Sequence, residues 1–132
     1  MWEVSVAVPL SARHRVRDEH GRGGLEHSHR WRIRAAVRAA TLDPTGWVLD
    51  FHVLAYLLRE LVAPYEGAYV NDVAPFDDVN PTRENIARVF ADGLAAKIDD
   101  ARAHVHRVEI WEGDECGATY YRPAPPLVPA RP

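Results

Sequence analysis

LEHSHRWRIRAAV, residues 25–37, is the stretch from which the fold of this chain can be predicted. From Trp31 onward its odd positions are apolar, and the even positions between them carry arginines, which is the alternation of a strand with one covered face. His27 and His29 share the parity of the apolar residues. We therefore expect both imidazoles to point toward the covered side of a sheet, where two neutral rings make half of a metal site.

A third histidine lies upstream on a similar pattern. Residues 2–12 alternate with apolar side chains at the even positions, and His14 has the same parity. His14 is therefore predicted to extend the same face of a first strand. The pattern alone leaves two interpretations open: a metal site, or a pair of solvated strand histidines that occurs by chance. A His-x-His pair is a weak motif, and this chain has seven histidines.

The rest of the chain predicts two helices followed by two more strands. A helical period runs from about His52 to Tyr65, and a second helix begins near its expected cap Thr82 and runs to about Ala101. Alternation returns over 104–111 and 118–122. This order predicts an α+β fold, a four-stranded antiparallel sheet with two helices on one face (β-β-α-α-β-β). We expect one domain over residues 1–122 and a proline-rich flexible tail over 123–132.

Two local expectations concern the entry to the first helix. Residues 42–46 contain Pro44 and Gly46 in a sequence typical of a turn, and residues 47–51 are predicted to be short and extended. The predicted apolar stripe of the first helix consists of Phe51, Leu54, Leu57, Leu58, Leu61 and Val62.

Composition narrows the cellular context and the partners. The formal net charge is −3 with both signs mixed, so we expect no nucleic-acid and no membrane partner. The single cysteine, Cys116, excludes an internal disulfide and fits a reducing compartment. The sequence shows no apolar run of membrane-spanning length and no secretion signal at its start. We therefore expect a cytoplasmic protein.

Up to about Arg122 the chain resembles the 6-pyruvoyl-tetrahydropterin synthase and 6-carboxy-tetrahydropterin synthase family. The resemblance is carried by SARH at residues 11–14, LEHSH at 25–29, DPTGWVLDF at 43–51, and YVND at 69–72 followed by NPTREN at 80–85. It implies the tunnelling fold and a homo-oligomer, a hexamer built as a dimer of trimers with active sites at subunit interfaces.

The resemblance also implies a site. It assigns His14, His27 and His29 as ligands of a zinc ion, and it assigns Glu112 to bind the N–H groups of a pterin ring. The competing interpretation of Glu112 is a solvated carboxylate at the end of a strand.

The proton-transfer residues of the family are missing. Gly23 stands where the family has a catalytic cysteine, and Glu66 and Gly67 stand where it has an Asp-His pair. The candidate replacements are Glu66, which keeps a carboxylate, and His20 in the glycine-bordered loop; the strand parity of Glu26 turns it away from the histidines.

These observations predict a divergent zinc-dependent lyase or cyclase that acts on a pterin-like ring or a related metabolite. Zinc with three histidine ligands would polarise a hydroxyl or carbonyl of the substrate. Two alternatives stay open. The chain could be a catalytically silent pterin- or purine-binding module, or an ordinary tetrahydropterin synthase with substitute residues from the 15–24 loop.

Overall fold

The computed structural model of the protein describes residues 1–125, which form one antiparallel sheet with the strand order β1-β2-β3-β4. The elements in chain order are β1 (Trp2–His14), β2 (His27–Ala39), α1 (Phe51–Val62), the 3-10 turns η1 (Ala63–Tyr65) and η2 (Val70–Asp72), α2 (Arg83–Ile98), β3 (Ala103–Glu112) and β4 (Cys116–Tyr121). The predicted fold class and element order are confirmed. Of the tail expected over 123–132, residues 126–132 lie outside the described part of the chain.

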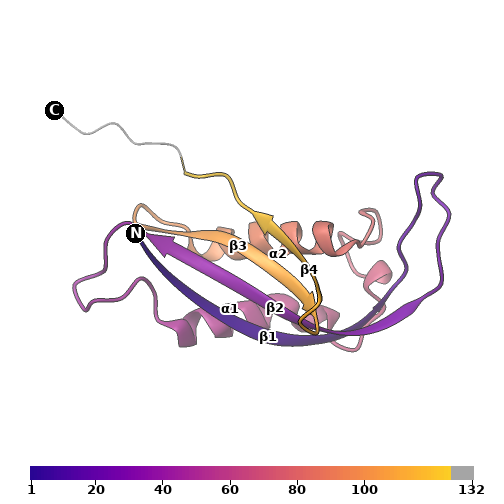
Figure 1. Cartoon of the computed structure of the whole chain (residues 1–132), viewed down its shortest axis with the longest axis horizontal. Helices are drawn as coiled ribbons and strands as arrows, with labels where there is room; N and C mark the ends of the chain where they lie inside the picture. Colours follow the sequence, from indigo (N-terminus) through magenta and orange to yellow (C-terminus); the bar gives the residue numbers. More distant parts are fainter. Residues whose placement is uncertain (126–132) are drawn as a thin grey trace.

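β1 and β2 pair along their whole length, and this pairing places the histidines. The register runs from Trp2 opposite Ala39 to His14 opposite His27, with His29 opposite Ala12. Residues of one parity on each strand are buried beneath the helices, as the alternation predicted. The histidines therefore gather at one end of the sheet, beside the loop over residues 15–26 (Figure 1).

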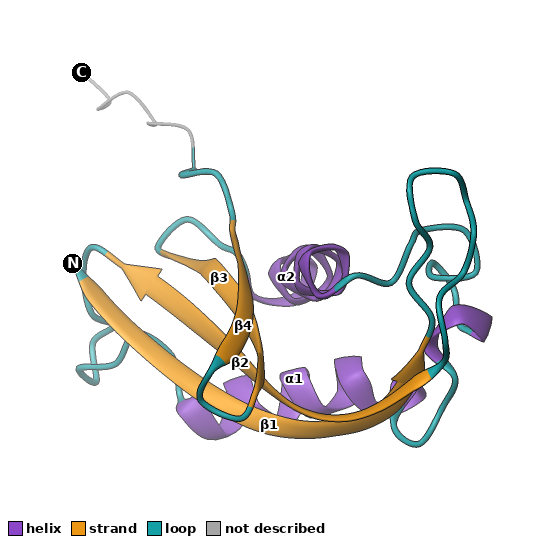
Figure 2. Cartoon of the chain, turned by 45° about the vertical axis from the view of Figure 1, so that its right-hand side comes forward, coloured by secondary structure: helices purple, strands orange, loops and turns teal. Residues whose placement is uncertain are grey.

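The two helices cover the same side of the sheet. α1 packs along β1, and α2 packs along β3 and β4 (Figure 2). The core between the layers is apolar, and its largest fully buried side chains are Trp31, Phe76, Phe90, Leu10, Ile33, Leu54, Leu58, Ile86, Leu94 and Ile110. Thr82 caps α2 as predicted, since its hydroxyl accepts a hydrogen bond from the Asn85 N–H at 3.1 Å.

The entry to α1 differs from the prediction. The turn predicted over 42–46 is confirmed, since Asp43 Oδ1 accepts from the backbone N–H groups of Thr45 and Trp47. Residues 47–51 do not form an extended segment, because the chain bends at residues 48–49 and α1 begins at Phe51. Asp50 then caps α1, so Phe51 is its first residue. The Phe51 side chain is 54% exposed and lies outside the core stripe, which begins three residues later at Leu54.

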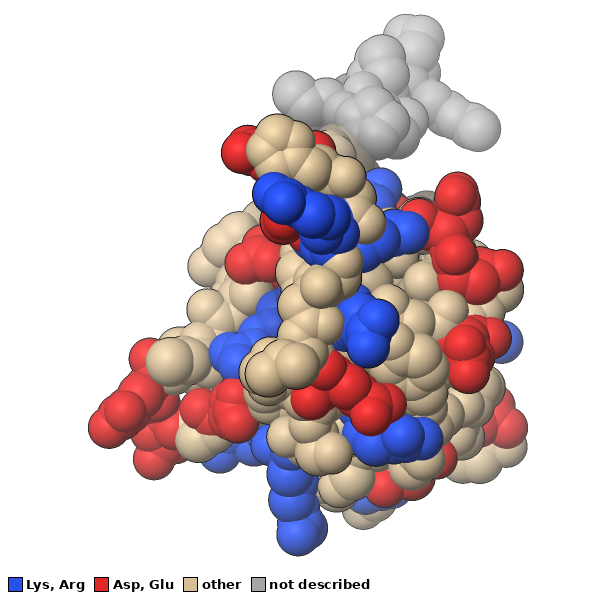
Figure 3. Space-filling view, turned by 90° about the vertical axis from the view of Figure 1, so that its right-hand side faces the viewer, with Lys and Arg blue, Asp and Glu red and all other residues tan. Residues whose placement is uncertain are grey.

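Among the described residues, no helix has both the length and the apolar composition that a membrane span requires. Acidic and basic side chains are interspersed over the end of the molecule where the 15–26 loop lies (Figure 3). This distribution agrees with the mixed charge of the sequence.

Candidate functional site

Three histidine rings lie together at the end of the β1–β2 pair. The ring centroids of His14 and His29 are 4.8 Å apart, and those of His27 and His29 are 5.9 Å apart. His14 is buried, the His29 side chain is 15% exposed, and His27 is exposed. The structure thus brings together the three residues that the sequence singled out as metal ligands.

His14 is held in one tautomer by the chain segment before α2. Its Nδ1 lies 2.9 Å from the carbonyl oxygen of Pro81. A carbonyl oxygen only accepts, so Nδ1 carries the hydrogen and Nε2 keeps a free lone pair. Burial lowers the pKa of His14, which favours the neutral ring. This arrangement is typical of a histidine that ligates a metal through Nε2.

His29 faces a carboxylate from β3. Its Nδ1 lies 3.1 Å from Glu112 Oε2, although the two groups are not aligned as a hydrogen bond, and Nδ1 is buried without any other partner among the described residues. Arg83, the first residue of α2, donates from Nη2 to the same Glu112 oxygen at 2.6 Å. The contact with His29, and then that with Arg83, lowers the pKa of Glu112, so this carboxylate stays ionised.

These side chains suit zinc in donor type and tautomer. A small rotation of the His29 ring would give Nδ1 its hydrogen bond to Glu112 and leave Nε2 free, the carboxylate–histidine arrangement common around zinc. The three rings do not yet converge: over residues 1–125, no three His, Cys, Asp or Glu side chains are set for metal binding. Zinc at this site therefore stays a prediction.

Glu66 lies apart from the histidines within one chain. Its Oε2 accepts from the backbone N–H of Ser11 at 3.1 Å, on the side of β1 that faces away from β2. Within the described chain, Glu112 is the only carboxylate within 4.0 Å of a ring nitrogen of the three histidines. One isolated chain thus does not bring Glu66 to the cluster.

His20 and Glu26 belong to the projecting 15–26 loop. The His20 side chain is 65% exposed, and its Nε2 lies 3.5 Å from Glu19. Glu26 forms an ion pair with Arg13 at 3.0 Å. The structure therefore places neither side chain against the histidine cluster.

Gly23 and Gly67, which stand where the resemblance places the family's catalytic residues, differ in backbone conformation. Gly67 has φ +68°, in the left-handed region that favours glycine, and its N–H donates to the Ser11 carbonyl at 2.7 Å. Gly23 does not have a positive φ, and a Cβ there would meet only the flexible Arg15 side chain, at 2.4 Å from Cδ. A residue other than glycine would therefore be strained at position 67. At position 23 it would fit once the Arg15 side chain moves aside.

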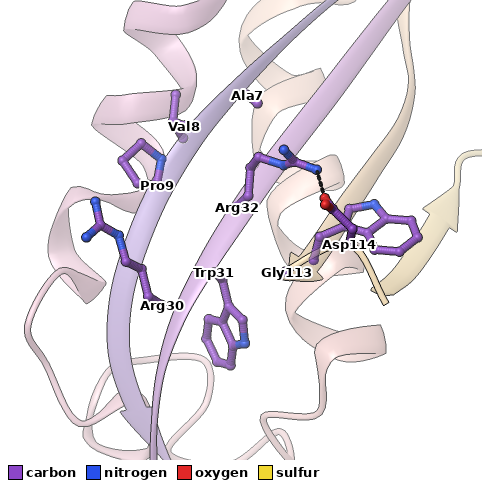
Figure 4. A pocket seen from close by; sticks show the side chains of 9 residues that line it. Ala7, Val8, Pro9, Arg30, Trp31, Arg32, Gly113 and Asp114 are labelled. Atoms are coloured by element: carbon purple, nitrogen blue, oxygen red, sulfur yellow. Dashed lines mark ion pairs between the residues drawn. The ribbon is translucent and has the colours of Figure 1, made fainter. Parts of the chain in front are cut away.

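Sequence reasoning did not single out Arg83. It lines a cavity of about 550 Å³ together with His14, beside the β3–β4 turn. Its pairing with Glu112 depends on the α2 N-terminus lying against the end of β3, which local sequence does not reveal. A second cavity, of about 330 Å³, lies between Pro9, Arg30 and Trp111, and Arg32 and Asp114 form an ion pair at 3.6 Å at its edge (Figure 4).

The β-β-α-α-β-β fold and the histidine cluster agree with the pterin synthase family that the sequence resembles. Comparison with known proteins confirms this family. Residues 3–123 match the family model described as 6-pyruvoyl tetrahydropterin synthase. The chain therefore belongs to this family, whose fold is the tunnelling fold.

Individual relatives are distant in sequence. A 6-carboxy-5,6,7,8-tetrahydropterin synthase of Bacillus subtilis is 26% identical over 103 residues, which cover 74% of this chain and 68% of the relative. The solved structure of 6-pyruvoyl tetrahydropterin synthase from Caenorhabditis elegans aligns with a TM-score of 0.78 at 21% identity, covering 92% of this chain and 96% of that one.

A second similar structure is a 6-pyruvoyltetrahydropterin synthase of Plasmodium vivax. It aligns with a TM-score of 0.68 at 17% identity and covers 92% of this chain and 99% of that one. That protein was solved as a variant in which a catalytic residue, a glutamate, is replaced by cysteine.

Proposed function

We propose that this chain is a zinc-dependent lyase or cyclase that acts on a pterin-like ring or a related metabolite and moves protons with residues unlike those implied by the family resemblance. The observation that carries the proposal is the histidine cluster. His14, His27 and His29 lie at one end of the sheet, the His14 tautomer leaves Nε2 free, and a charged Glu112 stands beside them.

The chain's own groups have distinct tasks in this proposal. Bound zinc would polarise a hydroxyl or carbonyl oxygen of the substrate and make a neighbouring proton more acidic. Glu112 would accept hydrogen bonds from N–H groups of the substrate ring. The Pro81 carbonyl holds the His14 ring in position, and Arg83 keeps the Glu112 carboxylate ionised and oriented.

Glu66 is the proposed proton-transfer residue, with His20 as the second candidate. β1 is an edge strand of the sheet, and although residues 67–69 line its outer side near Ser11, Glu66 there is exposed and open to another subunit. In the homohexamer that we propose, a dimer of trimers, Glu66 of one subunit would serve the histidine cluster of its neighbour. The Plasmodium vivax relative, with its catalytic glutamate, supports a carboxylate in this role.

One observation favours a second candidate function, a catalytically silent pterin- or purine-binding module. Gly23 and Gly67 supply no proton-transfer group, and within the described chain neither Glu66 nor His20 contacts the cluster. The retained metal-type histidines favour an enzyme, because a binding module has little need of a metal with an open position.

The reducing compartment suggested by the single cysteine fits a cytoplasmic enzyme.

Incubation with dihydroneopterin triphosphate separates these functions. Mass spectrometry of the small-molecule fraction, with zinc-loaded and chelator-treated protein, shows which bond of the substrate breaks. We expect a zinc-dependent shortening or elimination in the side chain of a pterin substrate. Tight binding of pterins with no zinc-dependent turnover of any pterin tested would contradict the proposal and favour the binding module.

A further inference from the structure

Arg83 and Glu112 form an ion pair at the wall of two adjoining cavities. The pair joins Arg83 Nη2 to Glu112 Oε2 at 2.6 Å, with the two side chains 24% and 43% exposed. Arg83 lines the cavity of about 550 Å³ that reaches His14, and Glu112 lines one of about 450 Å³ beside it. Both cavities are bounded by Glu115 and Cys116. Together they offer room for a two-ring heterocycle next to the histidines.

The pair has unused hydrogen-bonding capacity on both partners. Oε2 of Glu112 takes the contacts with Arg83 and His29, and within the described residues Oε1 has no hydrogen-bond donor. Among residues 1–125, the only hydrogen-bond partner of Arg83 Nη1 is the Cys116 carbonyl oxygen at 3.5 Å, which is long for a hydrogen bond. An acceptor and a donor, both charged, therefore stand side by side and are available to a ligand.

We propose that Arg83 determines substrate specificity by reading, with Glu112, the lactam edge of a 2-amino-4-oxo heterocycle. The ring N–H donates to the Glu112 carboxylate, and the adjacent ring carbonyl accepts from the Arg83 guanidinium. This inference rests on the proposed function, since it specifies which ring enters the same site. It names Arg83 as a binding residue for the carbonyl and leaves the proton-transfer residues unchanged.

The pairing predicts discrimination against a 4-amino ring of the same shape. In 2,4-diaminopteridine an amino group replaces the carbonyl, and the neighbouring ring nitrogen has no hydrogen. Arg83 would then face a donor and Glu112 a lone pair, so two charged groups would lose their partners and meet repulsion instead. A site built in this way rejects the wrong ring strongly, because its own polar groups are left unpaired.

The test is calorimetric titration of zinc-loaded protein with pterin and with 2,4-diaminopteridine, neither of which carries a phosphate or side chain. Wild type is expected to prefer pterin by about 10-fold or more. Arg83→Met removes the guanidinium and is expected to reduce the preference to about 3-fold or less, whereas Arg83→Lys, which keeps charge without the planar fork, falls between the two.

Arg88→Met is the matched control. Arg88 lies on the same helix, is exposed, and donates to Asn85 Oδ1 at 3.2 Å, away from Glu112. This variant is expected to keep the wild-type preference, and thermal unfolding of all variants confirms that they are folded.

Three outcomes would overturn the inference. If Arg83→Met keeps the full preference, or weakens both ligands equally, the arginine does not read the carbonyl. If wild type binds both rings equally well, the pair does not read the lactam edge; in each of these cases the proposed function stands. If folded, zinc-loaded wild type binds neither ring, the proposed function fails, and the inference fails with it.

Discussion

The residues proposed to hold zinc and substrate lie on a different kind of backbone from those proposed to move protons. His14, His29 and Glu112 sit on paired strands, in a register that fixes where their side chains point. Glu66 and His20, proposed to move protons, lie in connecting segments, as do Gly23 and Gly67, where the resemblance places the family's catalytic residues. Strand pairing fixes the positions of the residues that bind zinc and substrate, whereas loops tolerate substitution. The proton-transfer residues can therefore change while the zinc and substrate site stays intact.

The largest effect is expected from removing a strand-borne histidine. His29→Ala takes away one of three proposed ligands, so zinc affinity is expected to fall by about 100-fold or more. His20→Ala, in the loop, is the control and is expected to leave zinc affinity unchanged. Competition with a chromophoric chelator measures both. Equal affinity in the two variants would erase the proposed distinction between strand and loop histidines.

Glu66→Gln tests whether Glu66 transfers the proton, without disturbing the fold. The glutamine oxygen can still accept from the Ser11 N–H, while the basic carboxylate is gone. Turnover is expected to fall by about 100-fold with zinc content unchanged, which is typical of losing a general base. Glu60→Gln on α1 is the control. Undiminished kcat in Glu66→Gln would remove Glu66 from the mechanism and leave His20 as the candidate.

Glu112→Gln tests whether the strand-borne carboxylate binds the ring. Charge-assisted hydrogen bonds are lost, so affinity for pterin is expected to fall by about 10- to 100-fold, and by more than the affinity for zinc. Paired titrations with pterin and with zinc give the two ratios. A variant that binds pterin as tightly as wild type would show that Glu112 is a solvated strand carboxylate.

The two glycines are expected to respond differently to a side chain. Gly67→Ala forces alanine into a left-handed conformation and is expected to lower the free energy of unfolding by about 1 kcal/mol. Gly23→Ala is expected to change it by less than about 0.5 kcal/mol, because only the Arg15 side chain must move. Urea unfolding measures both, and equal losses would contradict the conformational difference between the two positions.

The carboxylate of Glu3 on β1 is expected to stabilise the folded sheet, whereas the carboxylate of Glu19 in the 15–26 loop is not. Glu3 pairs with Arg38 and Arg107, both at 2.8 Å, and the hydrogen bond from Arg107 is the main cause of its lowered pKa. Its contribution, about 1 kcal/mol, is present above the unfolded-state pKa and is lost as pH falls through the lowered folded-state pKa.

The test compares Glu3→Gln with Glu19→Gln, whose carboxylate is 87% exposed in the loop. Glu3→Gln is expected to be less stable than wild type at pH 7 and equal to it at low pH. Glu19→Gln is expected to match wild type at pH 7. A stability difference for Glu3→Gln that does not shrink on acidification would contradict the ion-pair account.

The strands were predictable because alternation is a local signal that burial enforces: Trp31 and Ile33 are buried, as their parity indicated. The cap at Thr82 was predictable for the same local reason. Phe51 was wrongly assigned to the buried stripe of the first helix. Helical spacing alone does not reveal that Asp50 caps α1, so that Phe51 is its exposed first residue. Arg83 was missed because its partner is distant in sequence and meets it only through the packing of α2 against β3.

Metal analysis of the purified protein tests the central claim most directly. Native mass spectrometry of wild type is expected to show one zinc per chain, and His27→Ala, which removes the exposed ring of the cluster, is expected to show none. Full zinc occupancy in His27→Ala, or wild type that binds no zinc when it is supplied, would contradict the assignment of the three histidines as a zinc site.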